Sequence, residues 1–169
     1  MLRVKGLILL SVLALSACEP TQPQVGPDGM PLPQVYKIRP GDADKIAYRV
    51  LDSVNSLRSA RATPPLTLNA QLNAAAAAHS RDMAAQNRPW HFGSDGSSPY
   101  DRAQRAGYMG QVLGENISET YETETETLSA WMGLADTRDV ILNPQARDLG
   151  FSWYQEPSGK IWWTMLTGG

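Results

Sequence analysis

The chain has 169 residues, of which 42% are hydrophobic and 19% are charged, and this composition fits one globular domain with a sizeable core. Its net charge of −2 argues against the basic surface that nucleic-acid binding needs, so no nucleic-acid partner is expected. The single cysteine, Cys18, excludes a fold that depends on internal disulfide bonds.

The first 17 residues have the pattern of a secretory signal. A short basic start precedes an apolar run over residues 7–15, which is too short for an ordinary membrane span. The following Leu15-Ser16-Ala17-Cys18 resembles a bacterial lipobox, which implies cleavage before Cys18 and lipid attachment to it. A plain signal peptide with an incidental cysteine is the alternative. The lipobox predicts a protein anchored by lipid in the bacterial cell envelope, outside the cytoplasm.

A proline-rich segment follows the cysteine. Six of the twelve prolines fall between residues 18 and 41, and such a density favours extended conformations and opposes a packed core. We therefore expect a signal peptide over 1–17, a tether over 18–41 and a folded domain over 42–169.

Helical spacing dominates the first part of the expected domain. Ile46, Val50 and Val54 recur at intervals of four, with Asp42 as a candidate N-cap. A second helix, capped by Asn69, carries His79 on its apolar stripe. A lone histidine there is more often a buried core residue with a hydrogen-bond partner than a ligand, and we predict the structural role.

The stretch 91–116 is the best candidate for a functional site. It begins with His91 in a Gly/Ser/Asp loop and ends with Glu115 between glycine and asparagine. A histidine and a glutamate in separate loops can line a polar cleft, or they can simply hold two loops together. The serines of this loop are predicted as turn and cap residues, with Ser98 capping a short helix that ends at Gly107.

The C-terminal part alternates between helix and strand signals. Residues 111–119 are predicted as a strand, and Thr123 with Glu126 forms a capping box that favours a helix over an exposed strand. Residues 136–142 are predicted as a short helix. Residues 149–155 and 161–166 are predicted to form a hairpin, with the adjacent Trp162 and Trp163 on opposite faces of the sheet.

Taken together, several short motifs resemble the CAP superfamily (cysteine-rich secretory proteins, antigen five and pathogenesis-related-one proteins) in its disulfide-free bacterial form. The resemblance implies an α+β fold, a three-layer α-β-α sandwich with a central antiparallel sheet. The motifs occur in family order from Asp42 to the end, and they are Asn55-x-x-Arg58, His79-Ser80, His91-x-Gly93-x-Asp95-Gly96, Asp101-Arg102, Gly107-Tyr108, Gly114-Glu115-Asn116, Trp131-Met132, Arg138 to Leu142 and Leu149-Gly150.

The same resemblance implies a cleft that usually holds two histidines and two acids. His91 and Glu115 match one residue of each kind, whereas Thr137 stands in place of the second histidine and Leu134 near the place of the second acid. Zinc needs three or four strong ligands, and only Asp95 or Asp136 could supply another by swinging into the cleft. No resident cofactor or metal is therefore expected beyond weak zinc binding, and Thr137 is expected to donate to Glu115 or His91.

The sequence thus favours a membrane-anchored, extracytoplasmic CAP-domain lipoprotein that binds a small apolar ligand, such as a lipid, or an envelope partner, without catalysis. The alternative is a metal-assisted hydrolase that acts on protein or cell-wall material. No serine, cysteine or threonine stands out as a nucleophile, and no catalytic residue is assigned. The ligand and the oligomeric state stay open.

Overall fold

The computed structural model describes residues 36–119 and 121–169. The predicted signal peptide, Cys18 and most of the predicted tether lie outside these residues. The prediction that the tether extends to Gly41 is wrong for its last six residues, because Tyr36 and Ile38 pack against the core. The side chain of Gln155 also bonds to this segment, accepting from the Ile38 N–H at 3.0 Å and donating to the Tyr36 carbonyl at 2.6 Å.

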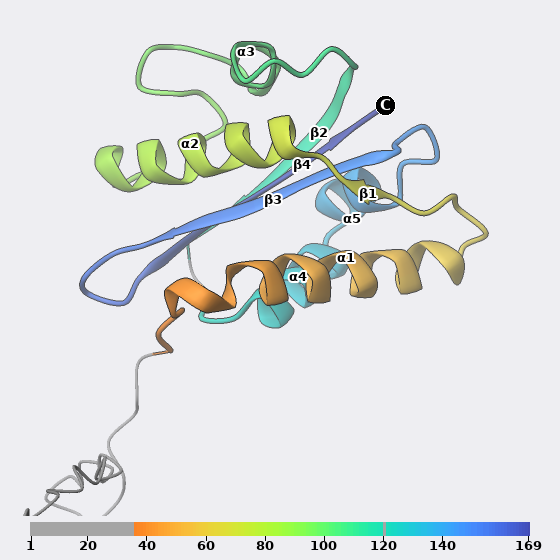
Figure 1. Ribbon diagram of the computed structural model, residues 1–169, viewed down its shortest axis with the longest axis horizontal. Helices are drawn as coiled ribbons and strands as arrows, with labels where there is room; N and C mark the ends of the chain where they lie inside the picture. Colours follow the sequence, from red (N-terminus) through yellow and green to blue (C-terminus); the bar gives the residue numbers. More distant parts are fainter. Residues whose placement is uncertain (1–35, 120) are drawn as a thin grey trace, which may run out of the picture. The chain divides into compact units, whose positions relative to one another are not determined.

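A four-stranded sheet forms the middle layer of the domain (Figure 1), with the strand order β1-β3-β4-β2. β3 pairs antiparallel with β4, and β4 with β2, whereas the two-residue β1 pairs parallel with β3. The three longer strands were predicted and are confirmed, but β1 is too short to show a period of two in the sequence. The strands are β1 (Thr67–Leu68), β2 (Val112–Ser118), β3 (Asp148–Gln155) and β4 (Ile161–Gly168).

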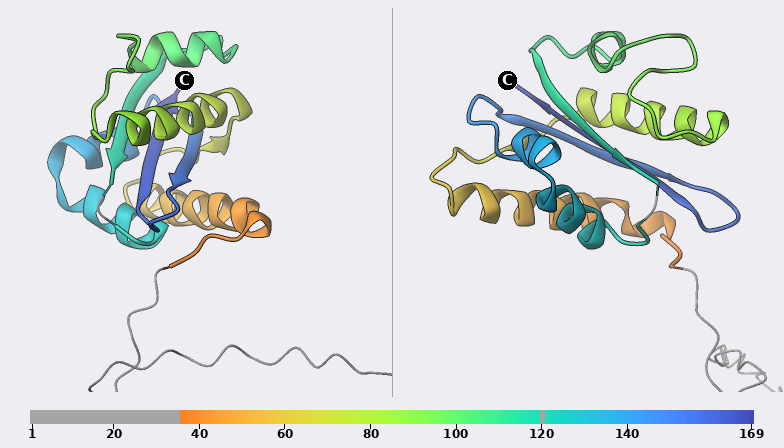
Figure 2. Two further views of the ribbon diagram at one scale, coloured as in Figure 1. Left: turned by 90° about the vertical axis from the view of Figure 1, so that its left-hand side faces the viewer. Right: turned by 180° about the vertical axis from the view of Figure 1, so that it is seen from behind.

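Helices cover both faces of the sheet, which confirms the predicted three-layer arrangement (Figure 2). One face carries α2 (Ala70–Gln86) and α3 (Pro99–Arg105). The other carries α1 (Ala43–Ser59), preceded by the short 3-10 helix η1 (Pro40–Asp42), and α4 (Glu124–Gly133) and α5 (Ala135–Leu142). None of the helices in the described part of the chain is long and apolar enough to span a membrane.

Local capping signals explain where most of these helices begin. Asn69 accepts hydrogen bonds from the N–H groups of Gln71 and Leu72, and Ser98 and Thr123 each start a helix with a reciprocal capping box. Asp42 precedes α1 as predicted, but its side chain makes no capping bond.

The core is divided by the sheet into two parts. On β3 and β4, odd-numbered residues such as Phe151 and Trp163 face α1, α4 and α5, whereas Leu166 faces α2 and α3. Trp162 and Trp163 are both fully buried, because helices cover both faces. Gly150 permits the close approach of α2 to the sheet, since a Cβ there would lie 2.3 Å from the backbone of Leu72.

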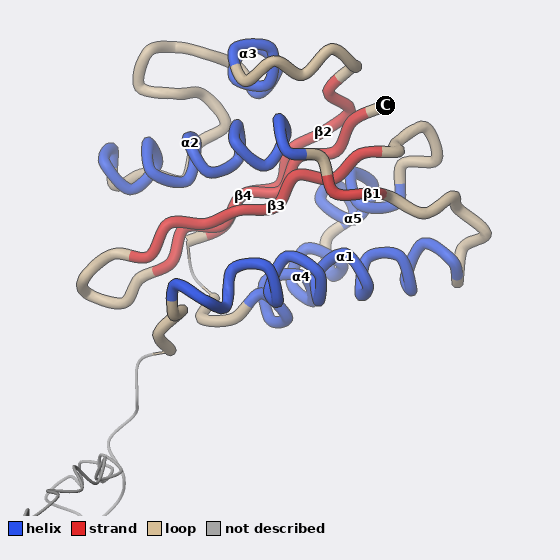
Figure 3. The backbone as a smooth tube through the Cα atoms, viewed as in Figure 1, coloured by secondary structure: helices blue, strands red, loops and turns tan. Residues whose placement is uncertain are grey.

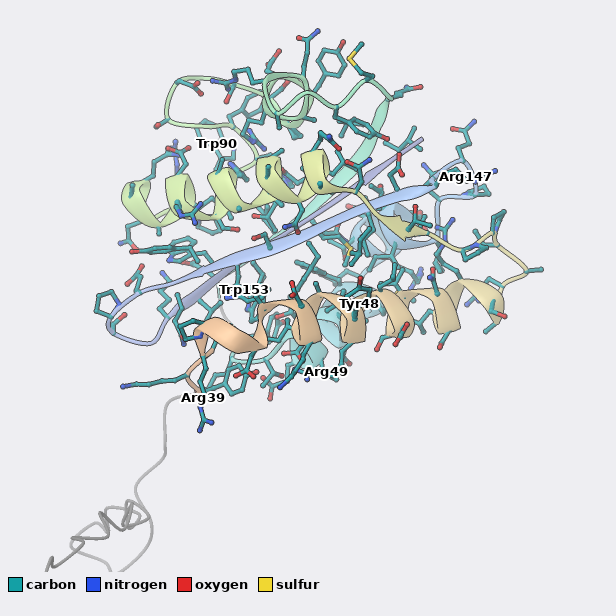
Figure 4. The ribbon with its side chains drawn as sticks, viewed as in Figure 1. Arg39, Tyr48, Arg49, Trp90, Arg147 and Trp153 are labelled. Atoms are coloured by element: carbon teal, nitrogen blue, oxygen red, sulfur yellow. The ribbon has the colours of Figure 1, made fainter. Side chains whose placement is uncertain are left out.

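A buried arginine ties α1 to the far end of the domain. Arg58 is fully buried and donates to the carbonyls of Pro64, Ile141, Asn143 and Ala146. Burial lowers the pKa of its guanidinium. Four carbonyl acceptors in place of a carboxylate make this a structural residue. The exposed Arg49 on α1 and the exposed Trp90 on the loop after α2 mark opposite sides of the sheet (Figure 4).

Candidate functional site

The candidate site is built around Glu115, which lies in the middle of the edge strand β2. The preceding Gly114 lets α5 approach the strand, because a Cβ at this position would lie 2.7 Å from the Val140 side chain. The Glu115 side chain is only 2% exposed. A carboxylate buried this far must be paired or hydrogen-bonded.

Three basic side chains from three different elements converge on this carboxylate. His91 Nδ1 lies 2.9 Å from Glu115 Oε1, and the Arg102 guanidinium donates to Oε2 at 2.6 Å. On the inner side, His79 Nε2 lies 3.7 Å from Oε1. His91 belongs to the loop between α2 and α3, a connection that Figure 3 shows in tan. The predicted proximity of His91 and Glu115 is therefore observed as a direct contact.

Arg102 is the member of this cluster to which the sequence reasoning gave no role. It is 7% exposed and also donates to the backbone carbonyls of His91 and Ser97. The arginine thus fixes the start and the end of the loop as well as the carboxylate. Its place in the Asp101-Arg102 motif was the only feature of the sequence that pointed to a role in the site. Otherwise, an arginine on a short surface helix is expected to be exposed.

His79 is fully buried, as predicted, but its surroundings differ from the prediction. Neither ring nitrogen makes a hydrogen bond of good geometry, and the ring belongs to the Glu115 cluster rather than to the apolar core alone. Burial lowers the pKa of His79, and the nearby Glu115 carboxylate opposes this shift. Desolvation therefore favours the neutral form of the imidazole, although the Glu115 carboxylate lies beside it.

The serines and aspartates of the loop build turns and do not reach the cleft. Asp82 accepts from the backbone and hydroxyl of Ser94, and these bonds lower its pKa although burial acts in the opposite direction. Hydrogen bonds from Ser97 and Arg105 hold the pKa of Asp95 well below its usual range. Asp95 is thus bound to Arg105 and does not turn towards Glu115, and Asp136 is exposed at the start of α5.

Two exposed aromatic residues flank His91 along the chain. The rings of Trp90 and Phe92 pack edge to face with centroids 5.7 Å apart, and the Arg88 guanidinium lies 3.8 Å from the Trp90 ring centroid. Along the chain, His91 thus lies between two rings that pack against each other.

A surface cavity of about 380 Å³ lies beside the cluster, along the edge of β2. His91 and Thr137 both line it, as predicted. The remaining lining is largely apolar and comes from the loop before His91, the end of β2, and α4 with α5: Pro89, Ile117, Ser118, Glu119, Tyr121, Ala130, Trp131 and Leu134.

The expected hydrogen bond from Thr137 to Glu115 or His91 is absent. The Thr137 hydroxyl donates to the Trp131 carbonyl at 2.6 Å, with the Leu134 carbonyl 3.4 Å away. The reason is local, because α4 ends at Gly133 and leaves carbonyls of its last turn without helical partners. Leu134, near the position expected for the second acid, is 65% exposed and offers only an apolar side chain.

The donor set does not fit a zinc ion of the kind that the fold family implies. Among the described residues, no three side chains of His, Cys, Asp or Glu are grouped to hold a metal. One oxygen of Glu115 already accepts from a guanidinium, whose positive charge would repel a cation. Thr137 directs its hydroxyl away from His91. The arrangement can instead hold the His91 imidazole in one orientation at the wall of an apolar cavity.

A mixed sheet between two helical layers, with a His–Glu pair at the edge strand, defines a protein of the SCP-domain class. The family model described as the Cysteine-rich secretory protein family (CAP) matches residues 51–166. The chain therefore belongs to the CAP family.

Similar proteins are found in bacteria. The chain is 30% identical over 129 residues to the uncharacterized protein YkwD of Bacillus subtilis, a match that covers 76% of this chain and 49% of that protein. An extracellular protein of Bacillus anthracis that contains an SCP domain has a TM-score of 0.67 at 26% identity, covering 78% of this chain and 44% of that one. An outer surface protein of Borrelia burgdorferi has a TM-score of 0.68 at 16% identity, covering 80% and 98% of the two chains.

These comparisons support a CAP-domain protein with extracellular bacterial homologues. The chain spans about half the length of the Bacillus subtilis relative. The likeness to the Borrelia protein, at 16% identity, shows the fold alone.

Proposed function

We propose that this chain is an extracytoplasmic CAP-domain lipoprotein whose cavity at the edge of β2 binds a small apolar ligand without transforming it. The observation that carries the proposal is the lining of the cavity, in which apolar residues such as Ile117, Trp131 and Leu134 lie beside a few polar side chains: His91, Ser118, Glu119, Tyr121 and Thr137. A largely apolar cavity of about 380 Å³ with a few polar groups is typical of a small-molecule site.

The proposed anchor is the lipid on Cys18, and it can be tested independently of the cavity. Cys18→Ser is expected to release the protein from membranes after fractionation while leaving its thermal unfolding unchanged. A Cys18→Ser protein that stays in the membrane fraction after signal cleavage would contradict the lipoprotein assignment.

Ligand binding is tested by mass spectrometry of small molecules that copurify with the folded protein. Ala130→Phe is expected to fill the cavity and to abolish copurification, because Ala130 lines it from α4. Ser129→Phe is the matched control, since Ser129 is exposed on the same helix and is not part of the lining. Equal recovery of apolar molecules from both variants would contradict binding in this cavity.

A metal-assisted hydrolase that acts on protein or cell-wall material is the second candidate. The observation that favours it is the short contact between His91 and Glu115, since an imidazole oriented by a carboxylate can move a proton. Hydrolysis assisted by zinc would also need a ligand set that the described side chains do not form.

A further inference from the structure

Two polar side chains that line the cavity, His91 and Thr137, have hydrogen-bonding roles that their other contacts fix. Glu115 accepts from the Arg102 guanidinium through Oε2, so this carboxylate acts as an acceptor and has no hydrogen to donate. The hydrogen between Glu115 Oε1 and His91 Nδ1, 2.9 Å apart, therefore belongs to Nδ1. In a neutral imidazole with its hydrogen on Nδ1, which this contact selects, Nε2 carries no hydrogen and is an acceptor.

The position of His91 makes this second nitrogen the one available to a ligand. The Glu115 side chain is 2% exposed whereas that of His91 is 51% exposed. The buried edge of the ring is the one that contacts Glu115, and His91 lines the cavity. Nε2 is thus on the open edge of the ring.

Thr137, which also lines the cavity, already donates its hydroxyl hydrogen to another group of the protein. Its hydroxyl donates to the Trp131 carbonyl at 2.6 Å, which leaves only lone pairs on Oγ1 for a ligand. The indole N–H of Trp131 is also used, because it donates to the Ile117 carbonyl at 3.2 Å. The carboxylate of Glu119, paired with Lys160, adds a further acceptor to the lining. Tyr121 at the same cavity can act as donor or acceptor.

We infer that the cavity selects amphiphiles whose head group donates a hydrogen bond, such as a neutral alcohol, and rejects carboxylates with the same hydrocarbon chain. This inference rests on the proposed binding function and names its ligand class. A hydroxyl can donate to His91 Nε2 or Thr137 Oγ1. A carboxylate would lose water and has no hydrogen to donate to these acceptors, which disfavours it.

The test compares three ligands that share a ten-carbon chain: 1-decanol, decanoate and 1-methoxydecane, which accepts but cannot donate. Calorimetric titrations at pH 8 use the full chain with Cys18→Ser, which cannot be acylated. The alcohol is expected to bind at least about tenfold more tightly than either of the other two, because each of them leaves the acceptors of the wall unpaired.

His91→Phe is the matched variant, since it keeps an aromatic ring and removes the acceptor nitrogen. It is expected to weaken decanol binding about tenfold and to leave methoxydecane binding unchanged. Thermal unfolding checks that the variant is folded. Thr137→Val, which removes the other acceptor, gives a second measurement if His91→Phe fails to fold.

The possible outcomes separate the inference from the function on which it rests. Binding of decanoate or methoxydecane as tight as that of decanol overturns the donor selectivity and leaves the apolar binding function standing. Failure of all three to bind overturns both. Equal weakening of decanol and methoxydecane by His91→Phe shows that the ring only shapes the cavity, and this also overturns the inference.

Discussion

On one side of the Glu115 carboxylate lie Arg102 and His79, whose side chains are 6% and 0% exposed. On the other side lies His91, whose side chain is 51% exposed. All three contact the same carboxylate, but the inner two come from packed helices, whereas His91 comes from a loop. The inner contacts are buried, whereas the outer one involves a half-exposed side chain.

This difference separates the buried contacts, which stabilise the fold, from the exposed side chain, which can contact a ligand. Removing one partner of a buried ion pair leaves an uncompensated charge without water, and the fold loses stability. Removing a half-exposed side chain leaves its partner accessible to water and costs little. The following predictions test this separation, from the largest expected effect to the smallest.

Arg102→Ala is expected to lower the free energy of unfolding by about 3–5 kcal/mol, because it leaves the Glu115 charge buried and unpaired. It also removes the bonds to the His91 and Ser97 carbonyls. Arg105→Ala is the matched control on the same helix. Arg105 pairs with Asp95 with side chains 57% and 53% exposed, so its loss should cost less than about 1 kcal/mol. Urea denaturation of the two variants measures the difference, and equal losses would contradict the division into inner and outer contacts.

His79 is expected to make stability depend on pH. Burial lowers its pKa in the folded state, so the unfolded chain binds a proton more readily than the folded one. The contribution of His79 to the free energy of unfolding is therefore fully present above the ordinary histidine pKa of about 6.5. It is lost as the pH falls below this value, by up to about 1.4 kcal/mol per pH unit.

The chain has only two histidines, which makes this test specific. His79→Gln should flatten the dependence of the unfolding free energy on pH between about 6.5 and 5, whereas His91→Gln should leave most of it. The shifted aspartates, such as Asp95, have lowered pKa values and act at lower pH. A parent protein whose stability does not change over this range would show that His79 has no such role.

Much of the fold could be predicted because its signals are local. The caps at Asn69, Ser98 and Thr123 depend on residues two or three positions away. β1 and the role of Arg58 could not be predicted, because both depend on residues about 80 positions further along the chain. The burial of Tyr36 and Ile38 was missed for the same reason, since their partner is Gln155.

The candidate site shows the same limit. His91 and Glu115 were found through their resemblance to a family, and no spacing rule would have brought them together across 24 positions. The role of Arg102 was not predicted because its carboxylate partner, Glu115, lies on a different element. The partner of Thr137 was predicted wrongly because the competing acceptor is local. A backbone carbonyl only six residues away accepts from its hydroxyl in place of the more distant side chains.

His91→Ala is expected to lower the free energy of unfolding by less than about 1 kcal/mol, because its side chain is half exposed and Glu115 keeps the Arg102 bond. Thermal or urea unfolding beside Arg102→Ala gives the comparison directly. A loss as large as that of Arg102→Ala would show that His91 belongs to the structural half of the cluster.

Thr137→His is expected to have a small effect on folding and a clear effect on metal binding. The substitution removes one hydrogen bond to the Trp131 carbonyl, worth about 1 kcal/mol, and adds a second imidazole to the cavity that His91 lines. Zinc prefers imidazole nitrogens to a hydroxyl, so calorimetric titration should show zinc binding at least about tenfold tighter than that of the parent. Adding His91→Ala to Thr137→His should remove the gain.

The parent itself is expected to bind zinc no more tightly than about micromolar, because Arg102 already occupies one oxygen of Glu115. Submicromolar binding by the parent that His91→Ala abolishes would show that the outer half of the cluster is a metal site, and it would favour the hydrolase over the binding protein.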